Sequence, residues 1–177
     1  MITSETSLPE LAVLVSEELA RHEISAVLTG GAAVTIWTNG RYTSYDLDFI
    51  SPAAEKAIRS AMAGLGFIKR GKDYVHAKTK FFVEFPTGPL AVGQALATSA
   101  DTFQLKKAGG SIRIISPTFS VMDRLAQYFY WNDRGALDQA VAVAVTNAID
   151  WGRIEAWAKA EGVASQLAAV RLRFAKR

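Results

Sequence analysis

Hydrophobic and polar positions follow distinct patterns in successive parts of the chain. Near the start, leucine and valine recur three or four positions apart, which predicts a helix over about 8–23. A short apolar run at 26–29 then ends in two glycines, and this pattern predicts a strand, a glycine turn and a helix over 32–37. From 46 to 50 the residues Asp-Leu-Asp-Phe-Ile alternate polar and apolar, as in a strand with one buried face.

Short strands continue through the middle of the chain, and helical spacing takes over after Ser116. After a helix from 51 to about 65, strands are predicted at 67–69, 74–77, 81–85, 102–106 and 111–115. Helical spacing covers 121–129, 137–149, 151–160 and 164–174. The predicted fold class is α+β, with a sheet flanked by helices and a C-terminal helical segment. No Pro/Gly/Ser-rich linker separates residues 1–115 from residues 116–177, so we expect the helical part to pack on the first part around one core.

Composition narrows the functional classes. With 50% apolar and 21% charged residues, the 177-residue chain has a globular composition. The absence of Cys excludes disulfides and thiolate metal sites, and two His residues disfavour a His-rich metal site or a Ser-His-Asp hydrolase. A formal charge of +3 is too small to indicate a nucleic-acid partner.

No apolar run reaches the roughly 20 residues of a membrane span and no signal sequence is recognised, so we expect no membrane partner and a cytoplasmic location.

Two aspartates in the predicted strand 46–50 are the first candidates for chemistry. Successive side chains of a strand face opposite ways, so Asp46 and Asp48 share one face while Leu47 and Phe49 enter the core. Two adjacent carboxylates repel each other unless a cation lies between them, and oxygen ligands suit Mg²⁺ or Mn²⁺. An Asp-x-Asp pair is a weak signal by itself, so its context has to support the metal site.

The context is a glycine pair at a strand-to-helix turn, fifteen residues before Asp46. Gly30 and Gly31 allow backbone N–H groups to approach a phosphate closely, and the following helix directs the positive end of its dipole at the anion. The pattern is neither a P-loop nor a Rossmann fingerprint, which disfavours kinase, GTPase and dehydrogenase functions. A purely structural tight turn explains the two glycines equally well.

A third carboxylate is expected near the aspartate pair, because two metal ions bridged by phosphate need further ligands. Glu84 is the candidate, since it interrupts the otherwise apolar strand 81–85 and its burial without a partner would cost several kcal/mol. A metal-ligand role, a salt bridge or an edge strand that turns Glu84 to water would each remove this cost. Asp73, in a predicted hairpin turn, is a weaker substitute.

Together these segments resemble a known superfamily. The chain carries Thr-Gly-Gly-Ala from Thr29, then Arg-x-Thr-x-x-Asp-x-Asp from Arg41 to Asp48, then a later acidic strand. This series resembles the DNA polymerase β-like nucleotidyltransferases, and within them the AbiEii-type toxin nucleotidyltransferases and their uncharacterised bacterial relatives. Further similar segments are Ser116-Pro117-Thr118, Asp123-Arg124-Leu125 and Trp131-Asn132-Asp133-Arg134. The resemblance covers about residues 26–140 and implies a nucleotidyltransferase-type mixed sheet.

The resemblance also implies roles for the candidate residues. Gly30 and Gly31 would bind the triphosphate of a nucleotide, and Asp46 and Asp48 would hold Mg²⁺ or Mn²⁺. Glu84 stands where the superfamily usually has Asp, and the longer side chain changes the reach of the third ligand.

Five further charged residues have two interpretations each. Arg41 neutralises phosphate or pairs with the aspartates. Asp123, Arg124, Asp133 and Arg134 fit ion pairs or caps on helix surfaces. In the resembling families this region lies near the catalytic cleft, so Arg134 is a candidate for substrate binding.

The sequence thus favours a metal-dependent nucleotidyltransferase that moves a nucleoside monophosphate from an NTP to an acceptor hydroxyl. The acceptor classes left open are RNA (including tRNA), protein and small molecules. The resemblance suggests a toxin–antitoxin or phage-defence component, with an antitoxin as a further partner. The alternative is a non-catalytic protein of the same fold that binds a nucleotide or a partner, which the Glu84 departure favours.

Overall fold

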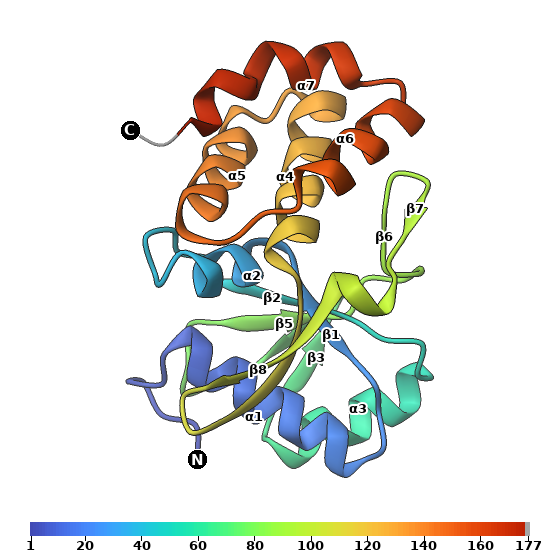
Figure 1. Ribbon diagram of the computed structural model, residues 1–177. Coiled ribbons are helices and arrows are strands. Elements are labelled where there is room, and N and C mark those ends of the chain that lie inside the picture. Colours follow the sequence, from blue (N-terminus) through green and yellow to red (C-terminus); the bar gives the residue numbers. More distant parts are fainter. Residues whose placement is uncertain (176–177) are drawn as a thin grey trace.

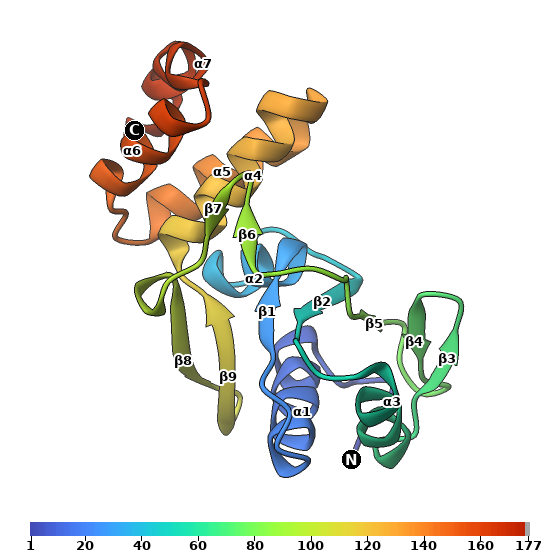
Figure 2. The same cartoon turned by 90° about the vertical axis from the view of Figure 1, so that its right-hand side faces the viewer.

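A seven-stranded mixed sheet forms the centre of the protein, in a computed structural model that describes residues 1–175 (Figures 1 and 2). In spatial order its strands are β3 (Ile68–Arg70), β4 (Asp73–Val75), β5 (Phe82–Glu84), β2 (Asp46–Ile50), β1 (Val27–Thr29), β9 (Gly110–Ile115) and β8 (Thr102–Lys107). The pairs β1/β9 and β2/β5 are parallel, and the other neighbours are antiparallel. The seven strands correspond to the predicted ones, with ends that differ by at most two residues.

Helices flank this sheet and form the C-terminal segment, so the predicted α+β class is confirmed. They are α1 (Leu8–Arg21), α2 (Gly30–Trp37), α3 (Glu55–Gly64), α4 (Pro117–Trp131), α5 (Arg134–Thr146), α6 (Trp151–Ala160) and α7 (Ala164–Val170), with 3₁₀ turns at Ser99–Asp101 and Arg171–Phe174. Figure 1 shows α4 to α7 gathered on one side of the molecule, beyond α2. No helix within residues 1–175 combines the length and the apolar character that crossing a membrane demands.

Local sequence fixes the start of α4, which matters because this helix borders the candidate site. Ser116 is the N-cap, and its hydroxyl oxygen accepts a hydrogen bond of 3.0 Å from the N–H of Phe119. Pro117 occupies the first helical position, where a missing N–H costs nothing. The helix ends at Asn132, which adopts a left-handed conformation with φ 54°.

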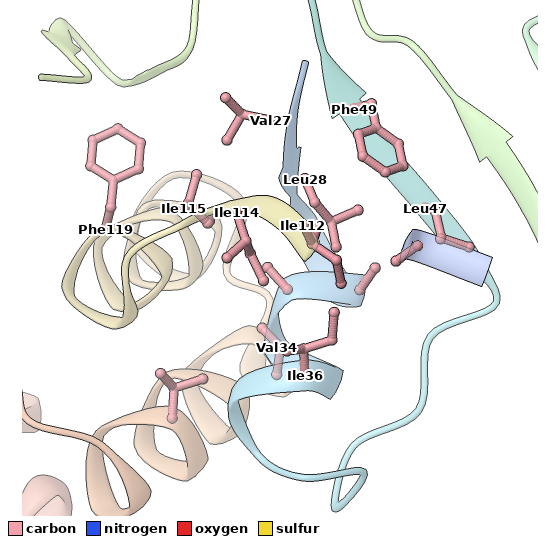
Figure 3. Packing of buried hydrophobic residues seen from close by; sticks show 14 of the residues in the cluster. Val27, Leu28, Val34, Ile36, Leu47, Phe49, Ile112, Ile114, Ile115 and Phe119 are labelled. Atoms are coloured by element: carbon pink, nitrogen blue, oxygen red, sulfur yellow. The ribbon is translucent and has the colours of Figure 1, made fainter. Parts of the chain in front are cut away.

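The core beneath the candidate site runs across three adjacent strands, β2, β1 and β9. Leu28 of β1 is paired with Phe49 of β2 on one side and with Ile114 of β9 on the other, and all three side chains are fully buried (Figure 3). Burial of each such side chain contributes about 1.5–3 kcal/mol to stability. The same hydrophobic cluster continues into the C-terminal helices through Leu125 and Trp157. The strands that carry the candidate residues are therefore held on a rigid apolar layer.

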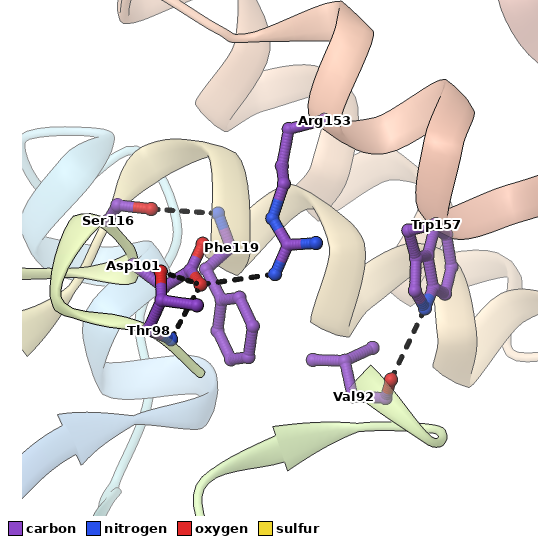
Figure 4. A network of polar contacts seen from close by, with 7 residues as sticks. All are labelled: Val92, Thr98, Asp101, Ser116, Phe119, Arg153 and Trp157. Atoms are coloured by element: carbon purple, nitrogen blue, oxygen red, sulfur yellow. Dashed lines mark hydrogen bonds and ion pairs between the residues drawn. The ribbon is translucent and has the colours of Figure 1, made fainter. Parts of the chain in front are cut away.

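A small hairpin, β6 (Ala91–Val92) with β7 (Ala95–Leu96), was not predicted from the sequence. It leaves the main sheet and lies beside α4 and α6 (Figure 2). The indole Nε1 of Trp157 donates to the carbonyl oxygen of Val92 over 3.2 Å (Figure 4). The N–H of Gln94 donates to Glu161 over 2.7 Å. The hairpin is thus attached to residues that follow it by more than sixty positions.

A buried carboxylate connects the same region to α6. Asp101 accepts hydrogen bonds from the N–H and the hydroxyl of Thr98, and its Oδ2 lies 3.1 Å from Nη2 of Arg153 (Figure 4). The carbonyl oxygen of Asp101 also accepts from the N–H of Ser116 over 2.7 Å. These contacts join the start of β8, the start of α4 and the first turn of α6.

Candidate active site

Asp46 and Asp48 project from β2 as its strand phase predicts. Both are half-buried on one face of the sheet, whereas Leu47 and Phe49 are fully buried on the other. Asp48 is in register with Thr29 of β1, whose hydroxyl donates to the carbonyl oxygen of Asp48 over 3.3 Å. The aspartate pair therefore sits at the centre of the sheet, next to the end of β1.

A buried serine orients the first aspartate, and sequence reasoning missed it. The hydroxyl of Ser44 donates to Oδ1 of Asp46, and the N–H of Ser44 donates to the hydroxyl oxygen of Thr35 over 3.1 Å. Ser44 is only 7% exposed, so its position is fixed by packing. The available signal was a hydroxyl two positions before Asp46, but only the burial of Ser44 distinguishes it from an ordinary loop serine.

The two glycines bring the start of α2 against the aspartates. Gly30 has φ +63°, and a Cβ at this position would collide with the carboxylate of Asp48. A Cβ on Gly31 would lie 2.8 Å from the hydroxyl oxygen of Ser44. Side chains are thus excluded at one position by the Asp48 carboxylate and at the other by Ser44, which orients Asp46. The first turn of α2, with its unpaired N–H groups and positive dipole end, approaches Asp48 for this reason.

A cavity of about 290 Å³ opens beside Asp48 and Gly30. Helix α4 contributes Asp123, Arg124 and Gln127 to its wall. The remaining lining is mostly apolar and comes from strand ends, the segment that leads to the β6–β7 hairpin and α4: Thr29, Ile50, Pro86, Pro89, Leu90, Ala91, Val92, Ile115 and Phe119. The cavity is thus bounded on one side by the catalytic candidates and on another by an arginine from the C-terminal helices.

Electrostatics single out Asp48 in this arrangement. Burial, together with the nearby carboxylates of Asp46 and Glu84, raises the pKa of Asp48 to about 6, and the Arg124 guanidinium opposes that rise. The charged form of Asp48 is therefore disfavoured until positive charge enters the site.

Glu84 lies on the predicted face, but its carboxylate is engaged elsewhere. In the parallel pair β2/β5 it is in register with Asp48, so both side chains belong to the same face. Its Oε1 lies 3.0 Å from Nζ of Lys72, in the turn between β3 and β4. Within residues 1–175, no three Asp, Glu or His side chains are grouped so that they could hold one metal ion. The predicted convergence of Asp46, Asp48 and Glu84 is therefore not seen in this part of the chain, where Glu84 is paired with Lys72.

Asp73, the weaker substitute in the sequence analysis, belongs to β4 and not to a turn. It is in register with Glu84, which extends the row of carboxylates from Asp48 across three strands. Its Oδ1 is buried and has no hydrogen-bond partner. The row therefore carries more negative charge than the aspartate pair alone.

The structure separates the arginine candidates. Arg134 is exposed at the first turn of α5 and does not line this cavity, so its role in substrate binding stays a prediction. Arg124, predicted as a helix-surface residue, lines the cavity: its Nε donates to Asp123 over 3.0 Å and its side chain is 16% exposed. Arg41 is exposed and takes part in none of the ion pairs found within residues 1–175, so its predicted pairing with the aspartates is not seen.

The donor set at β2 fits a hard divalent cation. Asp46 and Asp48 offer only oxygen atoms, and their mutual repulsion is relieved by a positive charge between them. The absent Cβ of Gly30 leaves room against the carboxylate of Asp48. Asp46 and Asp48 are the residues that would hold such an ion, and Glu84 could join them only by leaving Lys72.

Comparison with known proteins establishes the fold. No protein-family model and no curated protein sequence matches the chain. Among solved structures, an antigenic nucleotidyltransferase-like protein from Paracoccidioides brasiliensis aligns with a TM-score of 0.63 at 15% identity, over 99% of this chain and 96% of that one. The antibiotic-resistance factor ANT(2'')-Ia aligns with a TM-score of 0.59 at 12% identity, over 89% and 91% of the two chains. The chain therefore has a nucleotidyltransferase-like fold.

Proposed function

We propose that the protein is a metal-dependent nucleotidyltransferase that moves a nucleoside monophosphate from a nucleoside triphosphate to an acceptor hydroxyl. One observation carries the proposal: Asp46 and Asp48 share a sheet face beside Gly30, at the start of α2 and at the edge of a cavity. In a nucleotidyltransferase-like fold, this combination suits a triphosphate and its cation. Fold alone does not define an activity, so the proposal rests on the site.

Each residue of the site has a distinct task in this reaction. The N–H groups at the start of α2 bind phosphate oxygens, and Arg124 offers a second positive group across the cavity. Ser44 holds Asp46 in one orientation. The acceptor oxygen attacks the α-phosphorus while the bond from that phosphorus to the β-phosphate bridge breaks, and pyrophosphate leaves. Glu84 accepts the proton of the acceptor hydroxyl.

The implied cofactor is Mg²⁺ or Mn²⁺. When bound, it supplies Lewis acidity and neutralises charge on the phosphates. Asp46 and Asp48 would hold it, and Ser44 together with the glycine turn would keep these carboxylates in place.

A double Asp46→Asn/Asp48→Asn substitution tests the proposal. Nucleotide transfer from labelled triphosphates to total RNA, protein or small-molecule acceptors should fall by at least about 10²-fold, because the carboxylates position the reacting groups. In thermal melts, Mg²⁺ with a triphosphate should raise the Tm of the wild type and not that of the variant. An Asp138→Asn/Glu155→Asn variant, changed at exposed helix positions, is the matched control for charge. Equal ligand-induced shifts in all three proteins would refute the metal site.

The AbiEii-type resemblance adds a finer proposal, that the protein is the toxin of a toxin–antitoxin or phage-defence pair with an antitoxin partner. Its support is the Arg-x-Thr-x-x-Asp-x-Asp series from Arg41 to Asp48. Induced expression in bacteria should then arrest growth for the wild type and not for the double Asn variant. Normal growth with detectable transfer in vitro would favour an enzyme outside this class.

A non-catalytic nucleotide-binding protein is the second candidate. The specific observation in its favour is that Glu84 pairs with Lys72 and does not complete a three-carboxylate centre. This candidate expects the ligand-induced rise in Tm without any transfer to RNA, protein or small molecules.

A further inference from the structure

Lys72 places a positive charge beside Glu84, the third carboxylate of the candidate site. It lies in the two-residue connection between β3 and β4, where Arg70 and Asp73 close the hairpin. Its Nζ is 3.0 Å from Oε1 of Glu84. No role follows for Lys72 from the sequence, since a lysine in a hairpin turn is the ordinary choice for an exposed position.

Lys72 is positioned as a counter-ion for a row of three carboxylates, those of Asp48, Glu84 and Asp73. Glu84 is in register with Asp48 on one side and with Asp73 on the other, so three carboxylates line up across β2, β5 and β4. The Glu84 carboxylate raises the pKa of Lys72 above its usual value, and Asp73 and Asp48 add to this rise. A single ammonium therefore faces negative charge from three strands.

The two partners of this ion pair differ in how firmly they are held. The Glu84 side chain is 13% exposed and belongs to a central strand, whereas the Lys72 side chain is 78% exposed. Ion pairs with an exposed lysine contribute little to stability, so the ammonium can be displaced at small cost. A divalent cation carries twice its charge and prefers carboxylate oxygens.

We propose that Lys72 and a divalent cation compete for Glu84, so that Lys72 lowers the metal affinity of the protein and gives up Glu84 when the cation joins it to Asp46 and Asp48. This inference rests on the proposed metal role of the two aspartates. It accounts for the missing three-carboxylate cluster. Lys72 is on this basis a positioning residue, because it acts through Glu84.

Binding of Mn²⁺ to the full-length protein without nucleotide tests the competition. Lys72→Met should tighten Mn²⁺ binding about three- to fivefold, the upper part of the range that loss of an exposed ion pair corresponds to. Lys78→Met removes the same charge from the connection between β4 and β5, where Lys78 lies beside His76, and should change the affinity less than twofold. Equal effects of the two substitutions on Mn²⁺ affinity would overturn the proposal, because the change would then reflect the loss of net positive charge and not the loss of the contact with Glu84.

A double-mutant cycle ties the effect to Glu84. In a Glu84→Gln background, Lys72→Met should leave Mn²⁺ affinity unchanged, and persistence of the gain there would also overturn the proposal. Mn²⁺ binding by the Asp46→Asn/Asp48→Asn protein distinguishes a failure of the Lys72 competition from a failure of the proposed metal site. If it loses Mn²⁺ binding while Lys72→Met has no effect, only the competition fails; if it retains Mn²⁺ binding, the proposed metal site itself fails.

Discussion

The raised pKa of Asp48 gives the electrostatics of the site a measurable effect on protein stability. Burial and the carboxylates of Asp46 and Glu84 raise its pKa from the usual 3.8 to about 6. The folded protein thus binds this proton more tightly than the unfolded chain does. As the pH rises from 3.8 to about 6, the contribution of Asp48 to the free energy of unfolding therefore decreases, by at most about 3 kcal/mol in total.

We predict that denaturant unfolding in the presence of a chelator shows this slope between pH 4 and about 6 for the wild type. Asp48→Asn removes the titrating group, so its stability should vary less with pH and exceed that of the wild type near neutral pH. Stability curves that run parallel from pH 4 to 7 would show that Asp48 keeps its ordinary pKa.

The same residues show how far the sequence alone specifies the site. The strand phase of Asp46 and Asp48 follows from local alternation and is confirmed. That Glu84 shares their face depends on the register between β2 and β5, and its pairing with Lys72 depends on a third strand. Arg124 shows the same limit, because a helix-surface position becomes a cavity wall only once α4 is placed on the sheet.

At the scale of elements, the β6–β7 hairpin forms part of the cavity wall while its anchor lies far along the chain. Ala91 and Val92 line the cavity, and Glu161, just after α6, accepts from the N–H of Gln94 and from the hydroxyl of Tyr130 over 2.8 Å. Burial and the Glu161 carboxylate raise the pKa of Tyr130 to about 12, so the tyrosine remains a donor across the usual pH range.

Glu161→Ala should therefore loosen the hairpin. Hydrogen exchange of the amides at 91–97 should speed up at least about tenfold, since each lost charged hydrogen bond contributes about 1.5–3 kcal/mol. Exchange in β1 and β2 should not change. Glu155→Ala, on the exposed side of α6, is the control. If the hairpin amides remain equally protected, the hairpin is held by Trp157 and apolar packing alone.

The β6–β7 hairpin also shows which strands cannot be predicted from the sequence pattern. The seven main strands show runs or alternation of apolar residues, and the pattern finds each of them. Strands of two residues, set among Pro and Gly at 86–94, give no period to detect. Their structure is imposed by distant partners such as Glu161 and Trp157.

At the scale of the whole molecule, the helical part and the sheet share one hydrophobic cluster and a partly buried ion pair, Asp101 with Arg153. We predict a single unfolding transition, in which tryptophan fluorescence and far-UV circular dichroism coincide, since Trp37 and Trp157 lie in different parts of the cluster. Asp101→Ala should destabilise the protein by about 3 kcal/mol without separating the two curves. Two resolved transitions would show that the parts unfold independently.

The strand order has a consequence for how the chain is made. Leu28 in the central strand β1 pairs with Ile114 in β9, and all residues between them must be synthesised before the two can meet. At the usual speed of translation this takes roughly 4 to 17 s. During that interval the apolar edge of β1 is without its permanent neighbour and is open to chaperones or to other nascent chains. The glycine turn at its end can reach its final geometry only after most of the protein has left the ribosome.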